Sequence, residues 1–130
     1  MKRLDEIRKL IKVARQDRDI LAVFLFGSVA RNNSHQQSDI DICLVMKKGG
    51  DSAMELSQKK LEYLKLTDNM DVQIFQQLPL YIRIRIIKEG KILFCANEDE
   101  LYQLVFNTIR EFEDFKYTYQ DYLKEVASVR

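Results

Sequence analysis

The stretch that decides the fold begins with Gly27-Ser28-Val29-Ala30-Arg31 and, after a short polar loop, continues with Ser38-Asp39-Ile40-Asp41. An unbroken apolar run over residues 20–26 leads into it, and a second over residues 42–46 leads out. Apolar runs of this length, bounded by glycine or charged residues, are typical of buried β-strands. We therefore predict two strands, the second starting at Asp39, with a Gly-Ser turn at the end of the first.

Two carboxylates alternate along the second predicted strand. Residues i and i+2 of a strand point to the same face, ~7 Å apart, so Asp39 and Asp41 project together. A divalent cation removes the repulsion between them, and Mg²⁺ is commonly held by one or two carboxylates together with phosphate oxygens. Asp71 is the second residue of a third predicted strand over residues 70–75. If the two strands are neighbours, three carboxylates converge, enough to hold two metal ions ~4 Å apart around a transferring phosphoryl group.

The Gly-Ser turn has the complementary chemistry for a phosphate. Gly27 lets the backbone approach an anion closely, and a short helix opening at Ser28 would present its N–H groups to that anion. Arg31 could add charge-assisted hydrogen bonds. Each piece alone has a plainer structural interpretation, as a turn, a solvated strand edge or a surface arginine. Their combination predicts a site for a metal–nucleotide complex.

The rest of the chain predicts helices around a small sheet. Apolar residues recur at helical spacing over residues 3–17. Pro79 is suited to the first turn of a helix that ends at Gly90, and residues 91–95 follow as a short fourth strand. The fold class expected is α/β (α+β): a small mixed sheet of about four strands flanked by helices, with a long C-terminal amphipathic helix.

Two further helices carry start signals. Ser52 and Glu55 form a capping-box pattern, and that helix is expected to turn Met54, Leu61 and Leu64 inward. Asn97 is the predicted N-cap of the last helix, with a break expected near Asp114. That helix carries many aromatic residues, either as a core face with scattered exposed rings or as a surface for a partner. The rings are those of Phe106, Phe112, Phe115, Tyr117, Tyr119 and Tyr122.

Composition narrows the function classes. The 130 residues predict one domain over 1–130, with its core at about 20–95 and a C-terminal helical segment over 97–130. Lys plus Arg is 21 and Asp plus Glu is 20, which makes nucleic acid an unfavoured substrate. No apolar run approaches the ~18 residues of a membrane span, and the charged N-terminus does not suit a signal peptide. A cytoplasmic protein with reduced Cys43 and Cys95 is expected.

The pattern Gly27-Ser28-x10-Asp39-x-Asp41 resembles the signature of the polymerase-β-type nucleotidyltransferase superfamily. Gly-Ser-Val-Ala-Arg followed by Ser-Asp-Ile-Asp-Ile is similar to its minimal nucleotidyltransferase (MNT) branch. The resemblance covers residues 20–95, including the segments that start at Asp71 and at Pro79, and implies that superfamily's fold.

The resemblance also implies roles for these residues. Asp39, Asp41 and Asp71 would form the catalytic and metal site for two Mg²⁺ ions, with Asp71 as general base. The implied contacts to the ATP substrate are those of Gly27, Ser28, Arg31 and Ser38. An acceptor hydroxyl would attack the α-phosphorus and release pyrophosphate. Asn32 departs from the glycine of many relatives, although asparagine tolerates a left-handed backbone better than most residues.

The acceptor follows from the resemblance alone. MNT proteins often act as antitoxins beside a HEPN-domain ribonuclease and transfer AMP to a tyrosine of that toxin. A protein adenylyltransferase antitoxin with a HEPN toxin as partner is therefore implied. Separately, the aromatic residues of the C-terminal helix could support a homo- or hetero-oligomer. Two alternatives stay open: a non-catalytic module that neutralises its partner by covering it, and a small-molecule (antibiotic) nucleotidyltransferase. The three carboxylates favour an enzyme, and no acidic acceptor cluster supports the small-molecule alternative.

Overall fold

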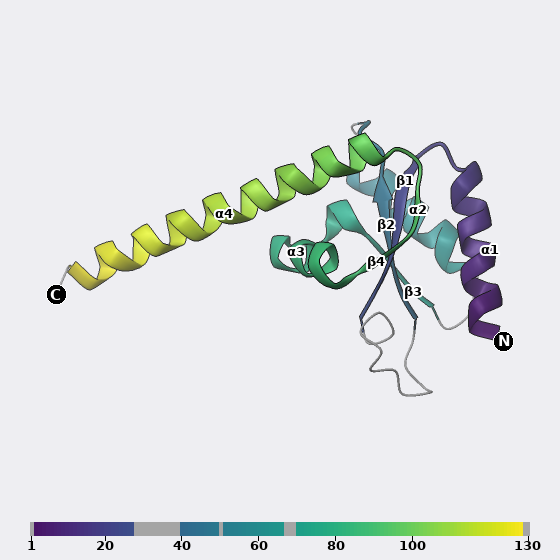
Figure 1. Ribbon diagram of the computed structural model, residues 1–130, viewed down its shortest axis with the longest axis horizontal. Coiled ribbons are helices and arrows are strands. Elements are labelled where there is room, and N and C mark those ends of the chain that lie inside the picture. Colours follow the sequence, from purple (N-terminus) through teal and green to yellow (C-terminus); the bar gives the residue numbers. More distant parts are fainter. Residues whose placement is uncertain (1, 28–39, 50, 67–69, 129–130) are drawn as a thin grey trace.

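The computed structural model describes residues 2–27, 40–49, 51–66 and 70–128 (Figure 1). Within these residues four strands form one sheet in the order β3-β2-β1-β4. β1 pairs antiparallel with both β2 and β4, whereas β2 and β3 are parallel, so the sheet is mixed as expected. The strands are β1 (Ile20–Phe26), β2 (Ile40–Met46), β3 (Met70–Ile74) and β4 (Lys91–Cys95).

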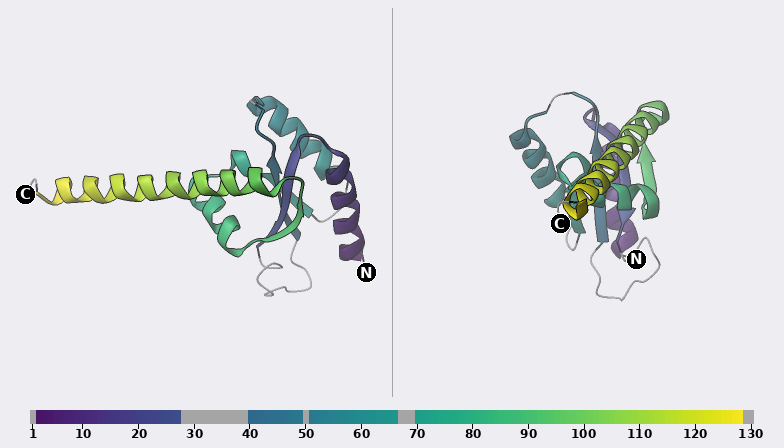
Figure 2. Two further views of the ribbon diagram at one scale, coloured as in Figure 1. Left: turned by 45° about the horizontal axis from the view of Figure 1, so that its top comes forward. Right: turned by 90° about the vertical axis from the view of Figure 1, so that its left-hand side faces the viewer.

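Helices cover both faces of the sheet, as the views in Figures 1 and 2 show. On one face, Ile42 of the sheet is buried with Leu10 of α1 and Tyr63 of α2. On the other face, Phe24 of the sheet is buried with Ile86 of α3 and Leu101 of α4. The helices are α1 (Lys2–Gln16), α2 (Ala53–Leu64), the short 3-10 helix η1 (Phe75–Gln77), α3 (Leu80–Glu89) and α4 (Glu98–Ser128). No helix in the described part of the chain is long and apolar enough to cross a membrane.

Most predicted elements are confirmed, with small shifts at their ends. The strands over 20–26 and 91–95 have the predicted limits. β2 is described from Ile40, because Asp39 lies outside the described residues. Phe75 belongs to η1 rather than to the third strand, and Pro79, predicted in the first turn of its helix, is the N-cap residue directly before α3. Cys43 and Cys95 are both free, and burial raises the pKa of the Cys43 thiol.

The buried face of α2 differs from the prediction. Leu64 packs on the core as expected, but Met54 and Leu61 are 72% and 56% exposed, whereas Leu56 and Tyr63 face the sheet. Met54 and Leu61 lie about 160° around the helix from Leu56 and Tyr63 at 100° per residue, so one helix face cannot bury both pairs. The predicted cap is confirmed, because the Ser52 hydroxyl accepts from the Glu55 N–H (3.2 Å).

Polar contacts select this face of α2. The Tyr63 hydroxyl donates to Asp17 (2.8 Å), and Lys59 forms ion pairs with Asp17 and Asp19 at 3.0 and 3.1 Å. Tyr63 therefore buries its ring without leaving its hydroxyl unpaired. These bonds hold α2 against the loop that precedes β1.

The last helix begins where the sequence predicts. The Asn97 side chain accepts from the Glu100 N–H (3.0 Å), as an N-cap does. The break expected near Asp114 is wrong, since α4 runs unbroken over 31 residues. Asp114 is exposed and has neither glycine nor proline beside it, so nothing in the local sequence interrupts the helix.

Candidate active site

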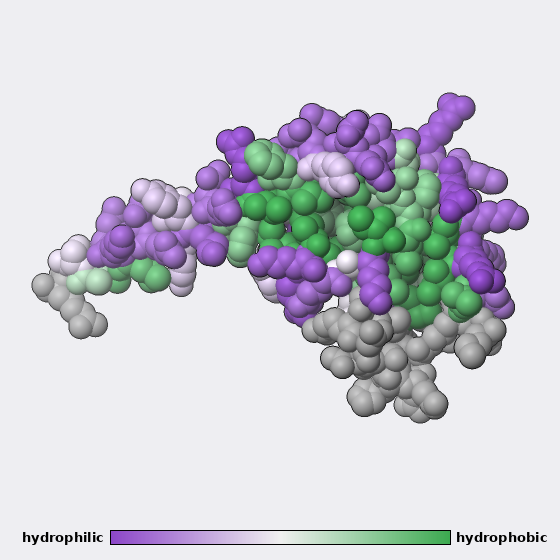
Figure 3. All heavy atoms as spheres, viewed as in Figure 1, coloured by the Kyte–Doolittle hydropathy of each residue, from purple (hydrophilic) through white to green (hydrophobic). Residues whose placement is uncertain are grey.

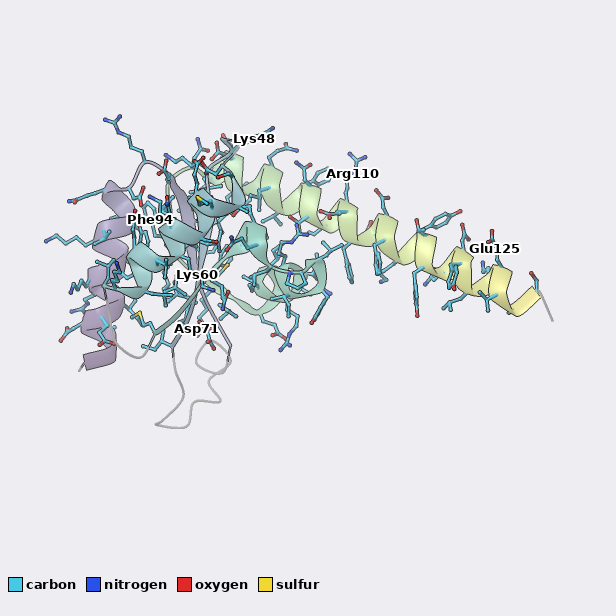
Figure 4. The ribbon with its side chains drawn as sticks, turned by 180° about the vertical axis from the view of Figure 1, so that it is seen from behind. Lys48, Lys60, Asp71, Phe94, Arg110 and Glu125 are labelled. Carbon is cyan, nitrogen blue, oxygen red and sulfur yellow. The ribbon has the colours of Figure 1, made fainter. Side chains whose placement is uncertain are left out.

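The candidate site lies at one end of the sheet, where β1 ends and β2 and β3 begin. Asp41 of β2 is in register with Asp71 of the parallel strand β3, and on its other side with Phe26 of β1. Neighbouring strands are about 4.8 Å apart, and in-register residues of a parallel pair point to the same face. The structure therefore brings the Asp41 and Asp71 carboxylates together. Figure 4 labels Asp71 at this end of the sheet.

Gly27 directly follows β1 and lies against Asp41. Its φ is +82°, a left-handed conformation that side chains rarely adopt. A Cβ at this position would also collide with the Asp41 carboxylate. The sequence predicted Gly27 for its approach to a phosphate. The structure adds a second reason for glycine, because the missing side chain leaves the space that the Asp41 carboxylate occupies.

A hydrogen-bond relay supports Asp71 from the edge of the sheet. The Gln73 amide nitrogen donates to both carboxylate oxygens of Asp71 at 3.3 Å. Lys60 of α2 in turn donates to the Gln73 amide oxygen (3.2 Å). Gln73 was recognisable only as the residue two positions after Asp71 on the same face, and Lys60 gave no sequence signal. The relay fixes the orientation of the Asp71 carboxylate.

A cavity of about 200 Å3 opens beside Gly27, between the end of β1 and α3. Arg85 and Glu89 line it together with Phe26 and Ile82, and Arg85 pairs with Glu89 at 3.6 Å. Arg85 is half exposed.

A larger cavity of about 510 Å3 lies elsewhere, lined in part by Leu21, Met46 and Thr108. Leu21 is the second residue of β1 and Met46 is the last of β2, so this cavity is at the opposite end of the strands from Asp41. Arg83 lines it and is held by the Leu78 carbonyl and Glu111. The smaller cavity is the nearer one to the carboxylate pair, because Gly27 lines it and lies against Asp41, although neither Asp41 nor Asp71 is among its lining residues.

The predicted site residues divide into two groups. Gly27, Asp41 and Asp71 are described and lie together. The others lie outside the described residues, and their site roles stay predictions: Ser28, Arg31, Ser38 and Asp39.

The residues present fit a magnesium ion. Asp41 and Asp71 offer oxygen ligands from adjacent strands, and two like charges so close are stabilised by a divalent cation. Within the described ranges no third histidine, cysteine, aspartate or glutamate joins them. A bound ion would then complete its coordination with phosphate or water oxygens, as Mg²⁺ commonly does.

Comparison with known proteins defines the class. The family model "Polymerase beta, Nucleotidyltransferase" matches residues 8–99. This chain belongs to that nucleotidyltransferase family. It is similar to MJ1547 of Methanocaldococcus jannaschii, a protein named for a proposed protein adenylyltransferase activity, with 43% identity over 76 residues. The match covers 58% of this chain and 56% of that protein, so the chain spans about half the length of this curated relative.

Solved structures share the fold. A chain of a toxin–antitoxin crystal structure with AMP-PNP aligns with a TM-score of 0.69 and 20% identity, covering 92% of this chain and 97% of that one. The second is a structure of the tri-AMPylated Shewanella oneidensis HEPN toxin in complex with MNT antitoxin. One of its chains aligns with a TM-score of 0.66 and 19% identity, covering 97% of this chain and 98% of that one. At these identities the likeness establishes the fold.

Proposed function

We propose that this protein is a Mg²⁺-dependent nucleotidyltransferase that transfers AMP from ATP to a tyrosine hydroxyl of a HEPN-type toxin, as the antitoxin of the pair. The observation that supports this type of reaction is that Asp41 and Asp71 are in register on neighbouring strands, next to Gly27, which has no side chain. The partner and acceptor are supported by the similar structures, which are toxin–antitoxin complexes, one with an AMPylated HEPN toxin. The name of the M. jannaschii relative supports protein as the acceptor class.

The proposed mechanism assigns a step to each group. Gly27 and Ser28 would receive the β- and γ-phosphates, and Asp39, Asp41 and Asp71 would hold the metal. When bound, Mg²⁺ neutralises charge on the phosphate oxygens as the transfer proceeds. The acceptor oxygen bonds to the α-phosphorus, the bond to pyrophosphate breaks, and Asp71 accepts the hydroxyl proton. Gln73 keeps both Asp71 oxygens oriented for that transfer.

Label transfer tests this function. The protein is incubated with Mg²⁺, α-labelled ATP and the HEPN-type protein, and label on that protein is counted. We expect Asp41→Asn, which removes a metal ligand, and Asp71→Asn, which removes the general base, each to lower the initial rate at least ~100-fold, the usual range for losing a general base. Asp5→Asn, an exposed residue of α1 with the same charge change, serves as the matched control and should keep the rate.

Two results would contradict the proposal. Wild-type rates in Asp41→Asn and Asp71→Asn would show that this carboxylate pair does not carry the reaction. Neutralisation of the toxin by wild type and both variants alike, with no label transferred, would show that the protein acts by covering its partner.

A further inference from the structure

Helix α4 carries an apolar seam with a coiled-coil period. The seam residues are spaced alternately four and three positions apart. The average spacing is 3.5 residues, which is the period of a helix face that packs along a single partner surface. The seam consists of Leu101, Val105, Thr108, Phe112, Phe115, Tyr119, Tyr122 and Val126.

The first half of this seam is covered by the rest of the protein. Leu101 and Thr108 are buried, and α4 packs there on α3 and β1. The Thr108 hydroxyl donates to the Leu104 carbonyl (2.8 Å), so the polar position in the seam is satisfied. The ion pair between Arg83 and Glu111 lies where α4 leaves α3.

The second half of the seam projects from the protein. Figures 1 and 2 show this part of α4 extending away from the sheet and the other helices. Phe115, Tyr119, Tyr122 and Val126 are 53–60% exposed, and the Phe115 and Tyr119 rings stack with centroids 6.1 Å apart. Hydrophobic residues also gather at one edge of α4 near its C-terminal end in Figure 3. Helices in proteins owe most of their stability to the packing of an apolar face against another surface. The exposed apolar face of this half therefore indicates that a partner covers it.

We propose that the projecting half of α4 docks the acceptor protein, by lying in an apolar groove whose rim carries lysine and arginine side chains. The identity of that partner as the acceptor rests on the proposed function. Leu123 is also exposed beside the seam, so the apolar face is wider than the two positions per heptad that a two-stranded coiled coil uses. A wide aromatic face suits a helix-in-groove complex, in which the groove covers several side chains at once.

Charge selects the partner. Residues 111–128 carry five acidic and two basic side chains, a net charge of −3. The acidic residues include Glu113, Asp114 and Asp121, and Figure 4 shows Glu125 far from the sheet. Two copies of this chain would bring the same excess of negative charge together, whereas a basic rim would be attracted. A partner with a basic rim is therefore favoured over a second copy.

The exposed area is adequate for such a role. A buried aromatic side chain contributes roughly 150–250 Å2 of contact area. More than half of each of the three rings is exposed, so together with Leu123 and Val126 they offer a partner roughly 400–500 Å2 of surface. A standard interface buries about 800 Å2 per partner, so this face supplies about half of one side. Flanking polar residues would supply the remainder.

The seam and the carboxylate site share no residue, so binding and chemistry can be measured separately. Binding of the HEPN-type protein is measured by calorimetry in the Asp41→Asn background. We expect Tyr119→Ala with Tyr122→Ala to raise Kd at least ~10-fold, the usual effect of removing interface anchor residues. Tyr117 is 69% exposed and lies outside the seam, so Tyr117→Ala is the matched control and should change Kd less than ~2-fold.

Further measurements decide the remaining outcomes. Circular dichroism must show equal helix content in the variants, and a several-fold rise in Kd from 50 to 500 mM salt would support the basic rim. Unchanged Kd in the double variant, with label transfer intact in wild type, overturns the docking surface and leaves the proposed function standing. Seam-dependent binding without any label transfer supports the docking surface and overturns the proposed function. Self-association that the double variant abolishes, with partner binding unchanged, assigns the seam to a second copy and overturns the inference.

Discussion

Replacing Gly27 with alanine perturbs the backbone and the site together. The residue keeps φ +82°, and a left-handed non-glycine residue costs roughly 1–2 kcal/mol. The new Cβ would lie 3.0 Å from the Asp41 carboxyl carbon and closer still to one of its oxygens. Asp41 must then leave its preferred rotamer, which adds about 1 kcal/mol. We expect Gly27→Ala to lower the free energy of unfolding by about 2–3 kcal/mol.

A double-mutant cycle separates the two contributions. In the Asp41→Ala background the carboxylate is gone, so Gly27→Ala should cost only the backbone strain, about 1–2 kcal/mol. The difference of about 1 kcal/mol exceeds the usual additivity error of ~0.3–0.5 kcal/mol. Urea unfolding supplies the energies, and in a chain of this size each kcal/mol should appear as a Tm change of roughly 4 °C.

Two results would refute the reasoning. A cost below about 0.5 kcal/mol for Gly27→Ala would mean that residue 27 does not need a left-handed backbone. An equal cost with and without Asp41 would mean that the glycine is not required by the carboxylate. The label-transfer rate adds a third check, because a displaced Asp41 should lower it by a factor of ten or more.

Other predictions follow from the relay, the metal site and Asp17. Gln73→Leu should lower the label-transfer rate about tenfold with a Tm change under ~3 °C, whereas Gln77→Leu, on η1, should leave the rate unchanged; equal rates would contradict the relay. Mg²⁺ with a non-hydrolysable ATP analogue at ~100 times Kd should stabilise wild type by about 2.7 kcal/mol and Asp41→Asn much less, as measured by thermal unfolding. Burial raises the pKa of Asp17, but hydrogen bonds from the Asp19 N–H, Tyr63 and Lys59 outweigh it and leave that pKa below its ordinary value. The stabilisation from Asp17 is therefore present above the unfolded pKa of about 4 and is lost as pH falls through the lower folded value, so Asp17→Asn should be less stable than wild type at pH 7, and the difference should disappear as pH falls through that lower value.

Local pattern was sufficient for the elements and for part of the site. The strands over 20–26 and 91–95 were predictable because their apolar runs and bounding glycines are local signals. The caps at Ser52 and Asn97 are also local, since each bonds to a residue three positions on.

What depends on distant contacts could not be predicted. The register of Asp41 with Asp71 is set by a parallel pairing that the segment between them does not encode. The buried face of α2 was mistaken because Tyr63 is fixed by Asp17, a residue 46 positions away. Hydropathy alone favoured the more apolar side chains Met54 and Leu61 over a tyrosine.

The position of β3 in the sheet has a consequence for thermal inactivation. Among the residues that the structure describes, β3 is an outer strand of five residues that pairs on one side only, and it carries Asp71. Outer strands of this length open by local fluctuation at a lower free energy than the strands between them. Each such opening separates Asp71 from Asp41 while β1 and β2 remain paired. Activity should therefore disappear at a lower temperature than the main unfolding transition, and amide exchange along β3 would report the same event.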